Sequence, residues 1–260
     1  MKFFVNEIIE DNEIKKLLVN NIEMSEKAKA VVEDIKTGNI PVLEKGIFPL
    51  FVLGHLADYT LSINNDRGIP KNITIDTLKD VNIWIANYKN QYNVLGLGEF
   101  NWLRNHYMGT LFRLGRLQFK LAKSLPGVPS GEYAIETHIP QGEPLNIEDC
   151  LLSFEKAKKF FKKFYPDKKP QYFMCDSWLL NPNLEKVLTR DSNIVKFMKL
   201  WTQFPFKSDG SNQAIKRVFG FEFDKANLMD APENTKLQKS LKEFLLGGGS
   251  MDSTAGWRKI

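Results

Sequence analysis

Two side chains that can carry a proton lie two residues apart in an alternating stretch of the sequence. Residues 132–140 read EYAIETHIP, and their period of two predicts a half-buried strand. Glu136 and His138 therefore share one face of that strand. Either could serve as a general base: the carboxylate through burial, the imidazole through its near-neutral pKa. Two structural alternatives remain open, a histidine that only closes the strand end and a glutamate that pairs with Lys120 or Arg116 across a hairpin.

A second group of reactive side chains follows a short apolar run that begins at Tyr172. The run predicts a strand buried on both faces, and the residues at its end are Cys175, Asp176, Ser177 and Trp178. Ligands of open α/β sheets bind at the carboxyl ends of strands. Ser177 is thus a candidate acid or substrate hydrogen-bond partner, and Cys175 a candidate nucleophile. Trp178 fits a pocket wall, and a core or turn role for the whole group is the alternative.

The segment between these strands predicts a helix that begins after Asn146 and ends at Tyr165-Pro166. Its apolar face is formed by residues at helical spacing: Ile147, Cys150, Leu151, Phe154, Ala157, Phe161 and Phe164. A strand–helix–strand of this length predicts a right-handed crossover between parallel strands. The N–H groups at the start of the helix could bind a phosphate. The acids Glu143, Glu148 and Asp149 would repel one, and a simple packing unit is the alternative.

The rest of the chain divides by its pattern near residue 111. Residues 1–110 carry helical periodicity throughout, with Ser25 as an expected N-cap and an apolar helix from 48 to 63 through the middle. Residues 111–121 alternate and predict a strand that pairs antiparallel with 132–140. After residue 180 we expect short helices, a strand near 201–206 and a last strand at 257–260. Ser192 and Thr235 are expected N-caps.

Composition excludes several classes of function. The chain has 260 residues, 43% hydrophobic and 26% charged, with a net charge of +5 spread mostly as lysine. We expect a solvated basic surface and no nucleic-acid partner, because no pattern of an RNA-binding module is present. Two isolated cysteines favour a reduced, cytoplasmic setting, and neither a signal peptide nor an apolar run of about 20 residues indicates a membrane segment. The three histidines lack metal-ligand spacing, so we expect no metal. Neither a phosphate-binding glycine loop nor a Gly-x-Ser-x-Gly elbow occurs in the sequence.

Four short segments carry a resemblance to a known family: FRLGRLQF, HIPQGEPL, CDSWLLNP and RVFG. They resemble bacterial proteins called acyltransferase domain-containing, which combine an N-acyltransferase N-terminal domain with a GNAT-like C-terminal domain. The resemblance implies an α+β or α/β fold, with a helical N-terminal half packed on a GNAT-like mixed sheet with flanking helices. It implies domains at residues 1–110 and 111–260.

The resemblance also implies a chemistry, acyl transfer from acetyl-CoA or another acyl-CoA to a small-molecule or peptide amine. In GNAT enzymes the cofactor binds where two parallel strands splay, with its pyrophosphate on the following loop. By position these cofactor-binding residues are Ile139, Gln141, Gly142 and Asn146, and the catalytic candidates are Glu136, His138 and Ser177. The loop departs from the family pattern Gln/Arg-x-x-Gly-x-Gly/Ala, because its two prolines lack N–H donors. The alternative is a non-catalytic GNAT-like module that binds a ligand or a protein.

Overall fold

The computed structural model describes residues 1–206 and 209–260, which form two compact units. The first contains Met1–Leu114 with Pro140–Gly142, and the second contains Gly115–Ile139 with Glu143–Ile260. Within the described residues, no helix has both the length and the apolar character needed to cross a bilayer.

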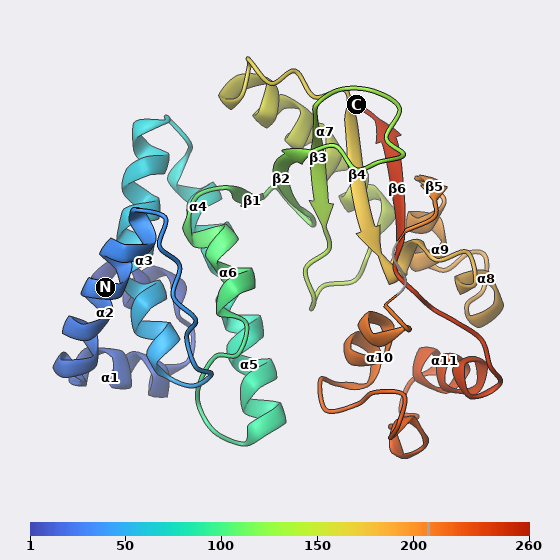
Figure 1. Cartoon of the computed structure of the whole chain (residues 1–260), viewed down its shortest axis with the longest axis horizontal. Helices are drawn as coiled ribbons and strands as arrows, with labels where there is room; N and C mark the ends of the chain where they lie inside the picture. Colours follow the sequence, from blue (N-terminus) through green and yellow to red (C-terminus); the bar gives the residue numbers. More distant parts are fainter. Residues whose placement is uncertain (207–208) are drawn as a thin grey trace. The chain divides into compact units, whose positions relative to one another are not determined.

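The first unit is helical, in agreement with the periodicity of its sequence (Figure 1). Its elements are a π-helical turn at Phe4–Ile8, α1 (Asn12–Asn20), α2 (Ile22–Lys36), α3 (Phe48–Asp66), α4 (Lys71–Leu78), α5 (Val81–Tyr92), α6 (Phe100–Tyr107) and the short β1 (Leu111–Arg113). Helix α3 is the centre of this unit, because it packs against α2, α4 and α6. Four consecutive residues of α3, Leu50 to Leu53, are fully buried, which only a helix covered on all sides allows.

The expected cap at Ser25 is wrong, because α2 begins three residues earlier. Asn21 is its N-cap, and the side-chain oxygen of Asn21 accepts a hydrogen bond from the Met24 N–H at 3.1 Å. Asparagine is at least as good a cap as serine, so the helix can begin at Ile22. Ser25 lies within the helix instead, where its hydroxyl is 2.9 Å from Nε2 of His55.

A buried carboxylate stabilises the packing of the first unit. Asp80 is 3% exposed and accepts a hydrogen bond of 2.9 Å from the indole N–H of Trp84. Nε2 of the fully buried His106 lies 3.5 Å from the same carboxylate oxygen. A buried charge of this kind is tolerated only because donors surround it.

The second unit is built on a mixed sheet whose strands lie in the order β2-β3-β4-β6-β5. The strands are β2 (Gln118–Lys123), β3 (Tyr133–His138), β4 (Tyr172–Ser177), β5 (Thr202–Phe204) and β6 (Thr254–Lys259). β3 pairs antiparallel with β2 and parallel with β4, so both pairings predicted from the sequence are confirmed. The expected continuous strand at 111–121 is wrong: β1 ends at Arg113 and β2 begins at Gln118. Gly115 turns the chain between them with φ +89°, which favours glycine.

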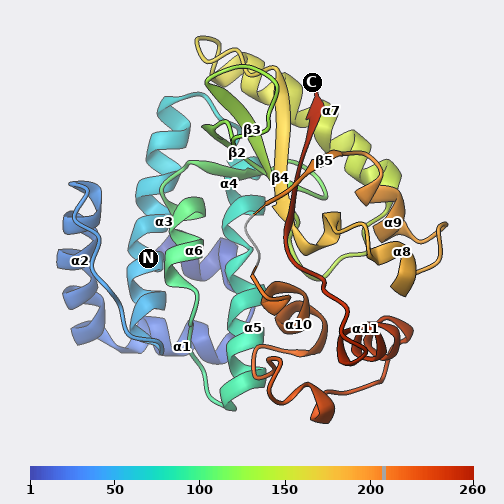
Figure 2. The same cartoon turned by 45° about the vertical axis from the view of Figure 1, so that its right-hand side comes forward.

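Helix α7 (Ile147–Phe164) covers one face of this sheet (Figure 2). Its Phe154 ring lies 5.8 Å from that of Phe119 on β2 and 4.9 Å from that of Phe173 on β4. The remaining helices follow β4: a 3-10 turn at Trp178–Leu180, α8 (Leu184–Val187), α9 (Asn193–Met198), α10 (Asn212–Phe219), a 3-10 turn at Leu228–Asp230 and α11 (Lys236–Leu246). The predicted caps Asn146, Ser192 and Thr235 are confirmed, since each side chain accepts a hydrogen bond from an N–H of its helix.

Candidate active site

The parallel strands β3 and β4 separate at their carboxyl ends. Within the described part of the chain they pair at two positions only, Ile135 with Phe173 and Glu136 with Met174. Beyond these positions each strand stays paired on its other side, β3 with β2 and β4 with β6. Beyond Glu136 and Met174 the facing edges of β3 and β4 are therefore not paired with each other. Thr137 lies at this opening, 2% exposed, and its hydroxyl oxygen finds no hydrogen-bond partner among the described residues.

Three titratable side chains lie on one face of the sheet at this opening. Glu136 and Met174 are directly paired, so they share a face, and alternation places His138 and Asp176 on that face too. Oε1 of Glu136 is 3.4 Å from Nε2 of His138. Lys120 on β2 is the cross-strand partner of Glu136, as one alternative interpretation of the sequence expected. The result is a cluster with two carboxyls, one imidazole and one ammonium.

The two carboxyls of this cluster differ in acidity. Burial by itself would raise the pKa of Glu136, but His138 and Lys120 outweigh it, so the pKa lies below its ordinary value. Burial raises the pKa of Asp176, the nearby Glu136 raises it further, and His138 offsets only part of this. Neighbouring carboxyls whose pKa values are moved in opposite directions are suited to opposite roles in proton transfer.

The other two candidates on β4 face the opposite side of the strand. Ser177 is buried, and its hydroxyl oxygen caps the following 3-10 turn by accepting a hydrogen bond from the Leu179 N–H at 3.2 Å. Cys175 is 1% exposed, and burial raises the pKa of its thiol well above the ordinary value, as do the charges of Asp176 and Glu136. A thiol with a raised pKa is a poor nucleophile at neutral pH. Cys150 and Cys175 are both free thiols.

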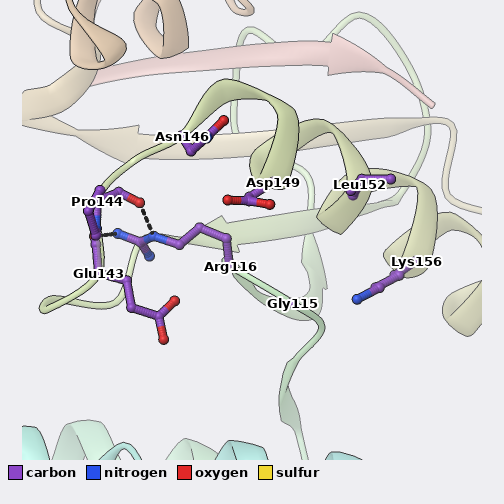
Figure 3. A pocket seen from close by; sticks show the side chains of 8 residues that line it. All are labelled: Gly115, Arg116, Glu143, Pro144, Asn146, Asp149, Leu152 and Lys156. Atoms are coloured by element: carbon purple, nitrogen blue, oxygen red, sulfur yellow. Dashed lines mark hydrogen bonds between the residues drawn. The ribbon is translucent and has the colours of Figure 1, made fainter.

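A cavity of about 470 Å³ lies beside the start of α7 (Figure 3). Its lining residues are Gly115, Arg116, Glu143, Pro144, Asn146, Asp149, Leu152 and Lys156. Arg116 is 7% exposed and points toward the loop before the helix (Figure 3). It donates hydrogen bonds to the carbonyl oxygens of Glu143, at 2.6 Å, and Pro144, at 3.0 Å. These contacts hold the loop against the hairpin, and the cavity carries two cations and two anions.

The four predicted cofactor-binding residues are divided between the two units. Ile139 and Asn146 belong to the second unit, and the side-chain oxygen of Asn146 accepts a hydrogen bond from the Glu148 N–H at 2.9 Å. Gln141 and Gly142 belong to the first unit, where the side-chain oxygen of Gln141 accepts a hydrogen bond from Asn87 at 3.1 Å. Gly142 has φ +111°, a conformation that requires glycine.

Sequence reasoning missed the contacts of Arg116 with the loop before α7 and the position of Asp176 on the face of Glu136 and His138. The sequence pattern suggests Arg116 only as a cross-hairpin partner of Glu136, because alternation predicts a strand that runs through Arg116 without a turn. The Gly115 signal was present and predicts a break there. Alternation in a strand from Tyr172 to Ser177 places Asp176 on the face of Met174 and not on that of Ser177. The register with β3 then brings it to the face of Glu136 and His138.

Two protein-family models match the chain, the GNAT-like C-terminal domain over residues 111–258 and the N-acyltransferase N-terminal domain over residues 4–109. The chain belongs to the GNAT-like C-terminal domain family. Its predicted GNAT-like fold, helices together with a mixed sheet, is therefore confirmed.

Solved structures of acyltransferases share this GNAT-like fold over the whole chain. A tryptophan-to-alanine variant of one, in complex with octanoyl-CoA, superposes with a TM-score of 0.84 at 22% identity, covering 100% of this chain and 86% of that one. An acyltransferase in complex with decanoyl-CoA and teicoplanin gives 0.78 at 25% identity, covering 100% and 83%. A third, in complex with CoA and 10C-teicoplanin, gives 0.79 at 23% identity, covering 100% and 86%. A search of the curated proteins found no match.

Proposed function

We propose that this GNAT-like protein transfers an acyl group from acyl-CoA to an amine. The observation that carries the proposal is the separation of β3 from β4 after Glu136 and Met174, directly before a helix whose first N–H groups can bind phosphate. The orphan hydroxyl of Thr137 supports it, since a buried polar group without a partner suggests that a ligand supplies one. The acyl-CoA complexes of the similar acyltransferases support the same substrate.

In this proposal His138 takes the proton of the attacking amine, and Glu136 positions and stabilises it. A carboxylate 3.4 Å from the imidazole stabilises the imidazolium that forms when the proton arrives. The lowered pKa of Glu136 keeps that carboxylate ionised at neutral pH. Acyl-CoA supplies an activated thioester when bound. Ser177, whose hydroxyl already caps the turn after β4, remains a candidate for a hydrogen bond to substrate.

We assign the phosphates of CoA to the segment 139–146 and the start of α7. Ile139, Gln141, Gly142 and Asn146 are the proposed contacts on the loop. Lys156 in the adjoining cavity adds a cation, while Asp149 opposes it. Because Arg116 is already bonded to two loop carbonyls, we assign it the role of holding the loop.

For the acceptor we propose an amine on a small molecule or peptide. Two of the similar acyltransferases were crystallised with teicoplanin or 10C-teicoplanin, so teicoplanin belongs in a first panel of amines. We also propose that residues 1–110 and 111–260 are the two domains of this enzyme, and that it acts in the cytoplasm.

Calorimetric titration with CoA and octanoyl-CoA tests binding. Two variants of cavity-lining residues test whether the cavity contributes to it. Lys156→Gln should weaken CoA binding and Asp149→Asn should tighten it, each by up to about fivefold, because a single solvent-exposed charge pair contributes about 0.2–1 kcal/mol. Equal affinities in wild type and both variants would remove the cavity from the proposal. If no acyl-CoA binds at millimolar concentration, the result favours the alternative function, a non-catalytic GNAT-like module that binds a ligand or a protein.

Turnover is tested by release of the CoA thiol with octanoyl-CoA and a panel of primary amines that includes teicoplanin. His138→Gln should lower kcat by about 10²- to 10⁴-fold, the usual contribution of a general base. Glu136→Gln should lower it less, because it removes only the group that positions the base. Full activity in both variants would exclude these residues from the mechanism.

A further inference from the structure

Of the three titratable side chains that β3 and β4 place on one face at the strand opening, Asp176 is the one to which the proposed transfer assigns no role. It shares a face with His138 and Glu136 and lies at the last position of β4 that does so. Its cross-strand neighbour on β6 is the uncharged Ala255. The charged groups that face it from the strands of its own unit are therefore Glu136 and His138, with Lys120 behind Glu136 on β2.

We propose that Asp176 is the general acid that protonates the departing CoA thiolate. This proposal rests on the proposed function. Amide formation needs a second proton transfer, because the sulfur leaves as a thiolate. A donor must lie on the same side of the strand opening as the base but must be a different group. Among the described residues of β3 and β4, Asp176 is the carboxyl that meets both conditions.

The pKa shifts of the two carboxyls agree with one acting as a proton donor and the other stabilising the protonated base. The pKa of Asp176 is raised by burial and by Glu136, so more of it stays protonated near neutrality than is usual for an aspartate. Glu136, by contrast, is held ionised beside His138. One carboxyl is thereby prepared to give a proton and the other to stabilise one.

Every proton that moves in the proposed reaction is taken up and returned by residues of this cluster. The C–N bond of the amide forms as the C–S bond of the thioester breaks, the amine proton goes to the imidazole of His138, and the thiolate sulfur receives the proton of Asp176. The imidazolium and the carboxylate that remain are on one face of adjacent strands, so the proton can return from His138 to Asp176. The net reaction is amine plus acyl-CoA giving amide plus CoA thiol.

This role is distinguishable from a structural one by the leaving group. Asp176→Asn should lower kcat/KM for octanoyl-CoA by about 10²-fold, the lower end of what a general acid contributes. With octanoyl-thionitrobenzoate, whose aryl thiolate leaves without protonation, the same variant should lose less than about threefold. In the wild type the rate should fall at high pH as Asp176 ionises, and this fall should be absent in Asp176→Asn. Asp176→Glu should restore part of the activity with octanoyl-CoA.

Ser177→Ala is the matched control, one residue away on the opposite face of the strand. Any effect it has should be the same for both donors. Equal losses for both donors in Asp176→Asn, with wild-type turnover intact, would overturn the role of Asp176 and leave the proposed function standing. A wild-type protein that turns over neither donor with any amine of the panel would overturn the proposed function and this role together.

Discussion

Removal of the Arg116 side chain should loosen the loop before α7 by an amount that the contacts allow us to estimate. Arg116→Met keeps the aliphatic stem and removes the donors to the carbonyls of Glu143 and Pro144. A hydrogen bond to a charged group contributes about 1.5–3 kcal/mol. Both carbonyls belong to exposed residues and can be rehydrated, and the variant no longer buries a guanidinium. The two bonds together should therefore contribute about 2–3 kcal/mol to the free energy of unfolding, which is no more than the lower limit of that range gives for two bonds.

The measurement is thermal unfolding by calorimetry, which resolves separate transitions where the two units unfold independently. Arg116→Lys should fall between wild type and Arg116→Met, because an ammonium cannot reproduce the two-pronged contact of a guanidinium. Lys156→Met is the matched control. It removes a cation from the same cavity, but Lys156 is exposed and should change stability by less than about 0.5 kcal/mol.

A second readout separates a loop effect from a global one. If Arg116 shapes the segment that binds CoA, Arg116→Met should weaken CoA binding by about tenfold, or about 1.4 kcal/mol, at a temperature where the variant remains folded. An Arg116→Met variant that unfolds within about 0.5 kcal/mol of wild type would refute the reasoning. It would mean that the two carbonyls gain as much from water as from the guanidinium.

Three further predictions concern stability and reactivity. The pKa of Asp176 is raised in the folded state, so wild-type stability should fall as pH rises from the ordinary aspartate range through that raised pKa. Asp176→Asn should therefore be more stable than wild type at neutral pH and lose this advantage at acidic pH, as followed by urea unfolding. Asp80→Ala should lower the free energy of unfolding by about 1–3 kcal/mol, because the buried indole N–H of Trp84 loses its acceptor. Cys150, whose pKa burial raises to about 11, and Cys175 should resist iodoacetamide until the protein unfolds, and rapid alkylation of the native protein would contradict their burial.

The elements of the fold could be predicted from the sequence wherever local signals agree. The helix at 147–164 has a cap, a charge gradient and an apolar face, and the structure places its bounds at those residues. The predicted strand at 111–121 failed because alternation was followed through Gly115, whose positive φ ends it. The prediction of Ser25 as an N-cap failed because Asn21, four residues earlier, caps the helix instead. Capping propensity does not distinguish between two residues that are both good caps.

The candidate site could be predicted only in part, because periodicity identifies faces and not distances. The shared face of Glu136 and His138 follows from spacing along one strand. The addition of Asp176 needs the register of β3 against β4, which no local signal specifies. The contacts of Arg116 with loop carbonyls 27 and 28 residues away are long-range and leave no trace in the pattern.

Alternation along β4 separates a structural side from a chemical side of the same strand. Cys175 and Ser177 face the side that α7 covers, where one is a buried thiol and the other caps a turn. Asp176 faces the side that carries His138 and Glu136. On the structural side of β4, the hydroxyl of Ser177 is satisfied within the protein. On the other side, the raised pKa of Asp176 lowers stability at neutral pH. That cost is the physical reason to look for the proton donor at Asp176.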